Sequence, residues 1–383
     1  MEQQNRNEYI WVMQQERTHF ENLNGLRFIG AFLVFLFHAF TINREVWGDF
    51  FESKPFLVLR KLTSVGHYGV NLFFVLSGFL ITYLLLKELK ERGKIHIGFF
   101  LVRRILRLWP LYFVIVLFGF FVFPHLPFGI QTVHEFWRYG LFLSNFDEII
   151  HGSRDSVNFL TATWSVSIEE QFYLGWALVI GVLQWKTIRS FQWFFLLVIA
   201  GSFAFRWYYS GQQAVIYYHT LSVISDMATG GLLATLVFEE TGIHWVTTLK
   251  KWQIIVLYLL GIGFLFTAHK LLPGKWISLE RLISGTFFAF VLLEQLIAQN
   301  SFFKADRIPY FERAGKLTYG FYLFHCLLIY YLCKLAEAWN WNQQAGYFGV
   351  YFITLLLLNT LLSILSYRYF EKPLLQLKRY FRA

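Results

Sequence analysis

Two ionisable residues interrupt one apolar stretch near the start of the chain. The stretch Gly25–Phe40 reads GLRFIGAFLVFLFHAF, and its ionisable side chains are Arg27 and His38. His38 follows Arg27 by eleven positions, and at about 100° per residue eleven steps return to within roughly 20° of the starting direction. Both side chains therefore share one helix face, about 16 Å apart along the axis. Because ionisable groups inside a bilayer rarely face lipid, we expect this face to line a reaction chamber within the membrane.

His38 is the candidate for the reacting group. An imidazole titrates near neutral pH, so it could act as a general base or carry an acyl group. The competing interpretation, about equally weighted for a lone membrane histidine, is a polar packing residue bonded to a neighbouring helix. The position of Arg27 on the same face favours the chemical role.

A cluster of arginines lies where a later apolar run begins, in the sequence RRILRLWP. Arg104 and Arg107 are three positions apart and share a helix face, with Arg103 beside them. Guanidinium groups match phosphate oxygens in two-point contacts. Together with Arg27 they could form a cationic pocket for a phosphate-bearing ligand, whereas ordinary anchoring of a helix at the inner membrane surface is the alternative.

Further polar residues interrupt other apolar runs. Glu169 and Glu170 occur in WSVSIEEQFYL, and adjacent helical residues point about 100° apart. We therefore expect one carboxylate to line the chamber and the other to form a structural bond. Asn71 and His325 lie in GVNLFFVLSGFLIT and LTYGFYLFH, and each needs a partner. Glu371, in YRYFEKP, could pair with an arginine of the cluster or simply begin the tail.

The composition identifies the class of protein. Of 383 residues, 56% are hydrophobic and 15% are charged, whereas a soluble domain usually has about 25% charged residues. We expect Phe136–Phe146, a short run that carries Arg138, to be a re-entrant or interfacial helix. The predicted fold is an all-α, polytopic transmembrane helix bundle. Apolar runs of near-bilayer length predict ten spans: Leu26–Ile42, Gly69–Leu86, Ile105–Phe123, Trp164–Leu183, Phe191–Tyr208, His219–Phe238, Trp252–Ala268, Leu282–Ala298, Leu317–Leu335 and Gly346–Phe370.

Loop charges predict how this bundle is oriented. Ten spans place both termini on one side, and with the termini inside, the inner segments hold about 20 Lys and Arg against about 8 outside, a positive-inside bias. Membrane topology then explains most of the net charge of +10. This removes most of the argument that the protein binds nucleic acid. We expect a cytoplasmic arm (1–21), a membrane domain (22–373) and a basic cytoplasmic tail (374–383).

The sequence offers no pattern typical of a metal or nucleotide site. The two cysteines, Cys326 and Cys333, lie seven positions apart in one apolar run, too distant on a helix for a disulfide. HExxH, CxxC and P-loop motifs do not occur, so we expect no metal and no nucleotide hydrolysis.

Taken in order, these motifs resemble the acyltransferase 3 family of bacterial integral membrane acyltransferases. The resemblance covers residues 22–373 and rests on Arg27-x10-His38, GVNLFFVLSGFLIT, RRILRLWP, WSVSIEEQFYL, LTYGFYLFH and YFEKP. It implies transfer of an acyl group from cytosolic acyl-CoA to a hydroxyl, usually on a sugar, at the bacterial cytoplasmic membrane.

The resemblance also implies roles for individual residues. His38 would be the essential catalytic residue, with Arg27, Arg104 and Arg107 serving the donor and Glu371 having a functional role. Five residues of the other motifs are expected on the acceptor side or in support: Asn71, Trp164, Glu169, Glu170 and His325. The family commonly has aspartate where this chain has Asn71, so a mechanism that needs a carboxylate there does not transfer to this chain.

The leading hypothesis is therefore O-acyl transfer, most simply of acetyl from acetyl-CoA to a carbohydrate or lipid-linked glycan. Its alternative is a transporter or flippase of a glycan or small molecule, with the same polar residues lining a translocation path. The sequence leaves several acceptors open: capsule or exopolysaccharide, lipopolysaccharide O-antigen, peptidoglycan and a secreted small molecule.

Overall fold

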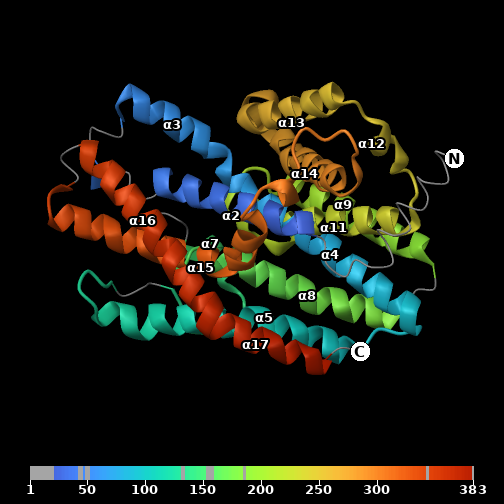
Figure 1. The fold of residues 1–383 in the computed structure, drawn as a ribbon, viewed down its shortest axis with the longest axis horizontal. Helices are drawn as coiled ribbons and strands as arrows, with labels where there is room; N and C mark the ends of the chain where they lie inside the picture. Colours follow the sequence, from blue (N-terminus) through green and yellow to red (C-terminus); the bar gives the residue numbers. More distant parts are fainter. Residues whose placement is uncertain are drawn as a thin grey trace.

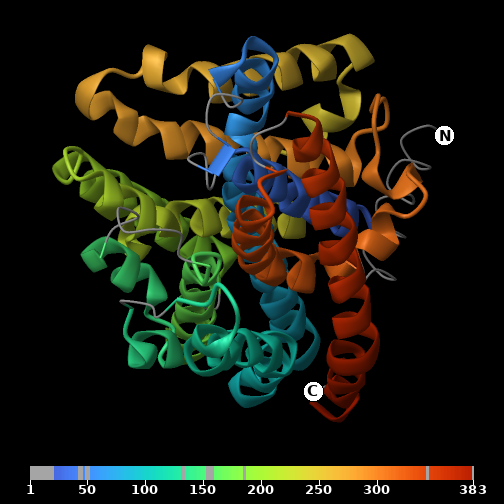
Figure 2. The ribbon, with the colours of Figure 1, turned by 90° about the vertical axis from the view of Figure 1, so that its left-hand side faces the viewer.

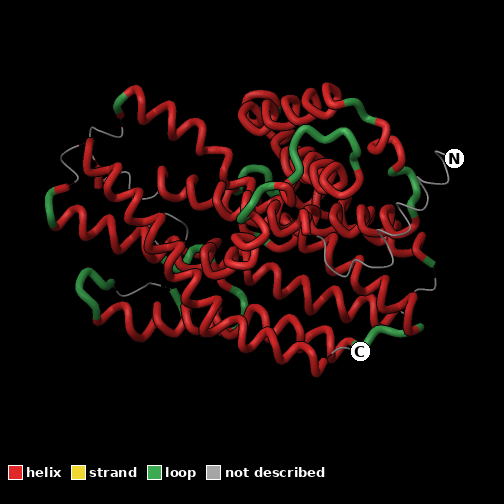
Figure 3. Tube along the Cα trace, in the orientation of Figure 1, coloured by secondary structure: helices red, strands yellow, loops and turns green. Residues whose placement is uncertain are grey.

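The computed structural model describes residues 21–41, 46–47, 52–130, 134–151, 159–183, 187–341 and 345–381. Regular structure within these ranges is helical throughout, as the tube in Figure 3 illustrates. The predicted N-terminal arm up to residue 20, Lys186 of one inner loop and the last two residues of the predicted tail lie outside the described residues.

Ten helices in this part of the chain are long and apolar enough to cross a membrane, so the predicted number of spans is confirmed. Their predicted positions also agree with the structure. The main helices are α2 (Glu21–Thr41), α4 (Gly69–Arg92), α5 (Ile97–Leu117), α8 (Thr163–Leu183), α9 (Ile188–Tyr208), α11 (Thr220–Glu239), α13 (Lys251–Leu271), α14 (Glu280–Ile297), α15 (Phe311–Ala338) and α16 (Ala345–Ser366).

Shorter elements extend or connect these helices. The predicted re-entrant run becomes two short helices, α6 and α7, and neither is a candidate span. The short elements are α3 (Lys54–Ser64), η2 (Val65–Tyr68), η3 (Phe118–Val122), η4 (Phe123–His125), α6 (Phe136–Gly140), α7 (Ser144–His151), α10 (Gln213–Tyr218), α12 (His244–Thr248), η5 (Gly274–Leu279) and η6 (Ala305–Arg307).

The last span continues beyond its predicted end. After α16 the chain runs through the π-helical turn η8 (Tyr367–Glu371), then α17 (Lys372–Gln376) and η9 (Leu377–Phe381). α17 and η9 pack against α5, beside which α17 lies in Figure 1. Most of the predicted basic tail is thus helical and covers the end of α5 that carries the arginines.

α4 runs through the middle of the bundle, as the blue segments of Figure 2 show, and glycines let its neighbours approach. A Cβ on Gly78 would lie 2.0 Å from the carbonyl oxygen of Met227 in α11, and one on Gly230 would lie 2.0 Å from that of Val75. A Cβ on Gly69 would similarly lie 2.5 Å from the carbonyl oxygen of Gly30 in α2. Small residues at such crossings are how membrane helices pack closely, and this close packing positions α2 and α4 around the site.

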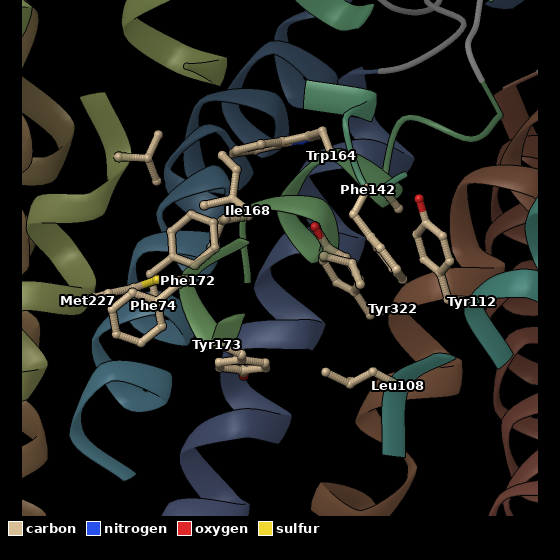
Figure 4. Close-up of a cluster of buried hydrophobic side chains, with 14 of the residues drawn as sticks. Phe74, Leu108, Tyr112, Phe142, Trp164, Ile168, Phe172, Tyr173, Met227 and Tyr322 are labelled. Atoms are coloured by element: carbon tan, nitrogen blue, oxygen red, sulfur yellow. The ribbon is translucent and has the colours of Figure 1, made fainter. Parts of the chain in front are cut away.

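α8 supplies much of the buried core. Its residues Trp164, Ile168 and Phe172 recur every four positions and are each at most 5% exposed. In Figure 4, Phe172 lies with Phe74 of α4 and Met227 of α11. This packing fixes the rotation of α8, and with it the directions of Glu169 and Glu170.

Candidate active site

A large cavity opens at the end of the bundle where α2 and α5 begin, which we call the basic end. It encloses about 2130 Å³ of empty space, part of it open to the surface. Eight Lys or Arg side chains line it against three carboxylates: Lys87, Arg92, Arg103, Arg104, Arg107, Lys316, Lys378 and Arg27 against Glu88, Glu91 and Glu371. Such a concentration of positive charge favours an anionic ligand.

A second, inner cavity continues from the first toward the bundle centre. It encloses about 750 Å³, and Arg27, Arg104 and Arg107 line both cavities. Its walls beyond the arginines are largely apolar, with Leu80, Ile81 and Leu108 among them. The two cavities together form one chamber, with a charged mouth and a narrower apolar interior.

Three of the predicted arginines stand without an ion pair in the part of the chain that the structure describes. Among the described residues, Arg27, Arg104 and Arg107 form no ion pair, and the buried Nε of Arg104 has no hydrogen-bond partner. Arg27 donates to Asn24 Oδ1 (2.9 Å). The Arg104 guanidinium lies 5.6 Å from the ring centroid of Tyr173. Buried charges are normally paired, so these groups have the capacity to bind an anion.

Arg103 has a different role from its neighbours. It donates to the carbonyl oxygen of Phe381 (2.7 Å) and to Glu88 Oε2 (3.2 Å). These bonds hold the C-terminal segment over α5, and Lys378 of that segment also lines the basic-end cavity. Arg103 therefore helps to close the mouth of the chamber.

The two adjacent glutamates of α8 divide as the helix geometry requires. Glu169 lines the inner cavity with the arginines and accepts a hydrogen bond from Ser77. Glu170 lines neither cavity of the chamber, and its Oε2 accepts from Trp109 Nε1 (2.8 Å). Glu169 is thus the chamber residue and Glu170 the structural one.

Glu371 lies in the chamber wall. It is 7% exposed, lines the basic-end cavity and accepts from Ser366 Oγ (2.8 Å). A Cβ on Gly320 of α15 would lie 3.2 Å from Glu371 Oε1, so this glycine makes room for the carboxylate. The residue belongs to the packed part of the structure.

The two predicted histidines meet each other. His38 Nδ1 of α2 lies 2.7 Å from His325 Nε2 of α15, and the rings stack with centroids 4.9 Å apart. His325 Nδ1 is hydrogen-bonded to the main-chain carbonyl oxygen of Tyr322. Since a carbonyl only accepts, His325 Nδ1 carries the proton.

This bond determines the tautomer of His38 when both rings are neutral. With its proton on Nδ1, His325 can only accept at Nε2, so His38 Nδ1 must donate. His38 Nε2 then keeps its lone pair, the form that a general base or nucleophile requires.

Cys326 completes a group that resembles a metal site in its residue types. Its Sγ lies 3.2 Å from His325 Nε2, and the ligand atoms of His38, His325 and Cys326 all lie within 4.8 Å of one another. Two nitrogens bound to tetrahedral zinc would be about 3.3 Å apart, given zinc–nitrogen distances of roughly 2.0–2.1 Å. The observed 2.7 Å is a hydrogen-bond length, so the arrangement fits a proton relay better than a metal centre.

The shared helix face predicted that His38 would line the chamber together with Arg27. The structure does not place it there. His38 is half-buried and lines neither cavity. The inner cavity reaches Phe73 and Tyr322, whose ring centroids are 6.0 Å apart. The Tyr322 ring centroid is also 5.4 Å from that of His325. Tyr322 therefore lies against both the chamber and the histidine pair, and is a residue that sequence reasoning missed.

Asn71 and Trp164 line neither of the two cavities that contain Arg27, Arg104 and Arg107. Asn71 lines a third cavity, toward the opposite end of the bundle. Trp164 packs with ring centroids 6.1 Å from Phe74 and 5.3 Å from Tyr217. Phe74 lines the inner cavity and Tyr217 lines the third one, so Trp164 stands between the two.

The structure is that of a polytopic helical membrane protein with an arginine-lined chamber and, across Tyr322 from it, a histidine pair. Residues 20–368 match the acyltransferase domain of the acyltransferase 3 family, and the chain belongs to this family.

Two relatives come from Staphylococcus aureus. The chain is 28% identical over 328 residues to the O-acetyltransferase OatA of strain NCTC 8325, which covers 81% of this chain and 53% of that protein. It is 24% identical over 378 residues to SACOL0978 of strain COL, a candidate O-acetyltransferase, covering 94% of this chain and 58% of that protein. The chain thus spans little more than half the length of these relatives. No solved structure matches it.

Proposed function

We propose that this protein transfers an acetyl group from acetyl-CoA to a hydroxyl of a glycan, and that its basic end faces the cytoplasm of a bacterium. The observation that carries the proposal is the convergence of Arg27, Arg104 and Arg107, without ion pairs among the described residues, on one connected chamber. The orientation follows from the positive-inside rule, since the Lys and Arg side chains gather at this end.

The donor would enter through the basic-end cavity. Coenzyme A carries several phosphate groups, which guanidinium forks and the Lys378 ammonium suit. Its long pantetheine arm is uncharged and suits the apolar walls of the inner cavity, lined by Leu80 and Ile81. This pose would carry the thioester past the arginines toward Tyr322.

His38 would then accept the proton of the acceptor hydroxyl. In the direct route, the hydroxyl oxygen forms a bond to the thioester carbon, the carbon–sulfur bond breaks, and His38 returns the proton to the leaving sulfur. In the second route His38 Nε2 forms a bond to the thioester carbon, the carbon–sulfur bond breaks and CoA leaves as its thiolate. The acceptor oxygen then displaces His38 Nε2 from the acetyl carbon, and the hydroxyl proton passes to the thiolate to give free CoA. In both routes His325 would hold His38 in the tautomer that exposes the lone pair of Nε2.

Either route requires the ring pair Phe73–Tyr322 to move. In the structure these side chains stand at the chamber end nearest the histidines. Side-chain rotation at this pair would admit the thioester, and its return would keep water away from it between turnovers. Tyr322 thus takes the role of a gate in the proposed mechanism.

The acetyl group and the hydroxyl acceptor are argued from relatives. Both relatives are named as O-acetyltransferases, which favours acetyl among acyl groups and oxygen as the accepting atom. A carbohydrate or lipid-linked glycan supplies such hydroxyls at a membrane surface.

The purified protein tests the proposal directly. Acetyl-CoA should raise its apparent melting temperature, and membranes that contain it should transfer radiolabel from acetyl-CoA to a glycan fraction. His38→Ala should retain the stabilisation and lose the transfer, because His38 lies outside the arginine-lined cavities. Stabilisation by a candidate solute but not by acetyl-CoA would overturn the proposal in favour of a transporter.

A further inference from the structure

A third cavity lies toward the opposite end of the bundle from the basic end, near the start of α4. It encloses about 720 Å³. Residues from α4, α9, α10, α13 and α14 line it, together with η2 and η5. They include His67, Asn71, Arg206, Tyr217, Glu280 and Arg281. None of them lines the inner or the basic-end cavity. The third cavity is therefore a separate site.

Buried polar groups with spare hydrogen-bonding capacity form its wall. Arg206 is 1% exposed and donates from Nε to the carbonyl oxygen of Ser278 (3.0 Å) and from Nη1 to Ser202 Oγ (2.8 Å). Its Nη2 has no partner among the described residues. A buried donor without a hydrogen-bond partner costs about 1–3 kcal/mol of stability. A ligand that accepts a hydrogen bond from Nη2 would recover this cost.

The charges of the third cavity are balanced, unlike those of the basic end. Arg281 Nη1 donates to Asp226 Oδ2 (2.6 Å), so its charge is paired. Glu280 accepts a hydrogen bond from Tyr68 and supplies a second carboxylate. Glu280 faces the cavity, and Asp226, which does not line it, neutralises Arg281 from outside the wall, so two carboxylates balance the two guanidinium groups and favour an uncharged polar ligand over a phosphate.

The third cavity opens to the surface through a shallower one. The two share Gln213, His269 and Ile277. The shallower cavity is formed by the connections around Gly211 and Gly274, which lie at the opposite ends of α9 and α13 from the basic end. Gln213 and His269 are exposed, so a ligand can enter here without passing the arginines.

The third cavity also adjoins the proposed reaction centre. The His67 ring centroid is 5.5 Å from that of Phe37, the residue before His38. On another wall, Tyr217 packs against Trp164, which packs against Phe74 of the inner cavity. Tyr217, Trp164 and Phe74 thus stand in series between this cavity and the inner cavity, and His67 and Phe37 stand between it and His38.

We propose that the third cavity binds a neutral, hydroxyl-rich sugar unit of the acceptor. The inference rests on the proposed function and assigns its acceptor site. Sugar hydroxyls both donate and accept, so they match a wall that mixes the Asn71 amide, the Glu280 carboxylate and the Arg206 guanidinium. The ring of Tyr217 offers an apolar face beside these groups, as sugar rings require.

The experiment blocks the entrance without altering the chamber. Gln213→Trp and His269→Trp place a bulky ring where the third cavity meets the surface. His244→Trp is the matched control, an exposed histidine at a helix end that lines none of these cavities. Saturation-transfer NMR on the detergent-solubilised protein measures binding of four neutral disaccharides: chitobiose, maltose, lactose and N-acetyllactosamine. Inorganic phosphate is the anionic competitor.

We expect at least one disaccharide to bind the wild type and His244→Trp, and its affinity to fall about tenfold or more in both blocking variants, a loss of about 1.4 kcal/mol. The proposal is overturned if no disaccharide binds the wild type, if phosphate displaces the sugar, or if His244→Trp loses binding equally. Stabilisation by acetyl-CoA is measured on the same samples. Its absence would instead count against the donor site and the proposed function.

Discussion

The Nδ1 atom of His38 lies 2.7 Å from Nε2 of His325, and the two residues are 287 positions apart in the sequence. The pair joins α2 to α15, and the main-chain carbonyl oxygen of Tyr322 fixes the proton on the far side of His325. The geometry is that of a base held in one tautomer by an orienting partner, the arrangement that activates histidine in many group-transfer enzymes.

Replacing His325 tests this orienting role. In His325→Gln the side-chain amide oxygen can still accept from His38 Nδ1, whereas His325→Leu offers no acceptor. We expect the leucine variant to lose about 10²–10⁴-fold in kcat, the usual contribution of a positioned acid or base, and the glutamine variant to recover part of it. Acetyl transfer measured as a function of pH is the readout.

A purely structural role for His325 makes a different prediction. Both variants would then lose activity in proportion to their loss of thermal stability, and the pH profile of the remaining activity would match the wild type. A shifted pH profile in the glutamine variant would instead place the effect on His38.

The arginines without ion pairs should act on donor binding. Arg104→Gln and Arg107→Gln each remove a charged group from the chamber, worth about 1.5–3 kcal/mol, so the KM for acetyl-CoA should rise about 10–100-fold with a smaller change in kcat. Arg104→Lys keeps the positive charge but loses the two-point contact of the guanidinium group. Its KM for acetyl-CoA should therefore lie between that of the wild type and that of Arg104→Gln. Arg313→Gln is the control, since Arg313 is exposed and lines neither cavity. An equal effect of all four substitutions would argue against a specific clamp.

The ten spans were predictable because each depends only on a local run of apolar residues. Helix geometry predicted that only one of Glu169 and Glu170 would face the chamber. It could not predict which of the two that would be. The packing of Trp164, Ile168 and Phe172 into the core resolves that choice.

The site required tertiary information. Arg27 lines the chamber, but the helix period placed His38 beside it and could not reveal that the aromatic side chain of Tyr322 would lie against both the chamber and the histidines. The pairing of His38 with His325 likewise depends on how α2 packs against α15, which no periodicity reports. Nor does the sequence indicate that the hydroxyl of Ser77 donates to Glu169.

The crossing of α4 and α11 should be sensitive to a single methyl group. A Cβ at Gly78 would lie 2.0 Å from a main-chain oxygen, so Gly78→Ala should destabilise the protein by about 1–3 kcal/mol through overpacking. Gly175→Ala in α8 is the matched control, because a Cβ there meets no atom within 4 Å. It should be neutral or stabilising by up to about 1 kcal/mol. Apparent melting temperatures in one detergent compare the two, and equal values would contradict the close crossing.

The Asp147 carboxylate should make the stability of the fold depend on pH in the acidic range. Burial opposes its charge, but hydrogen bonds from His134 and Arg138 outweigh burial and hold the pKa of the Asp147 carboxyl below its ordinary 3.8. Because the folded pKa is the lower one, the carboxylate stabilises the fold above about pH 3.8, and this stability is lost as the pH falls through that value toward the folded pKa. Melting temperatures between pH 3 and 7 should show this decline.

Asp147→Asn isolates the contribution of this carboxylate. The variant should be less stable at pH 7 by about 1.5–3 kcal/mol, the value of hydrogen bonds to a charged group, and should lose stability less steeply in acid. Glu135→Gln is the control, since Glu135 also pairs with Arg138 (3.1 Å) but its side chain is 47% exposed. A decline in acid that is unchanged in Asp147→Asn would assign it to other groups.

The ring of Tyr322 should favour acetyl transfer over hydrolysis of acetyl-CoA. Its hydroxyl is hydrogen-bonded to Ser165 Oγ (2.7 Å), and its ring stands between the inner cavity and His325. Tyr322→Ala removes the ring but keeps the main-chain carbonyl that orients His325. Water should then reach the thioester, so release of free CoA without acceptor should rise while transfer to the acceptor falls. Tyr322→Phe keeps the ring, loses one hydrogen bond of about 0.5–1.5 kcal/mol, and should resemble the wild type. If the alanine variant hydrolyses acetyl-CoA no faster than the phenylalanine variant, the ring does not separate the donor from the base.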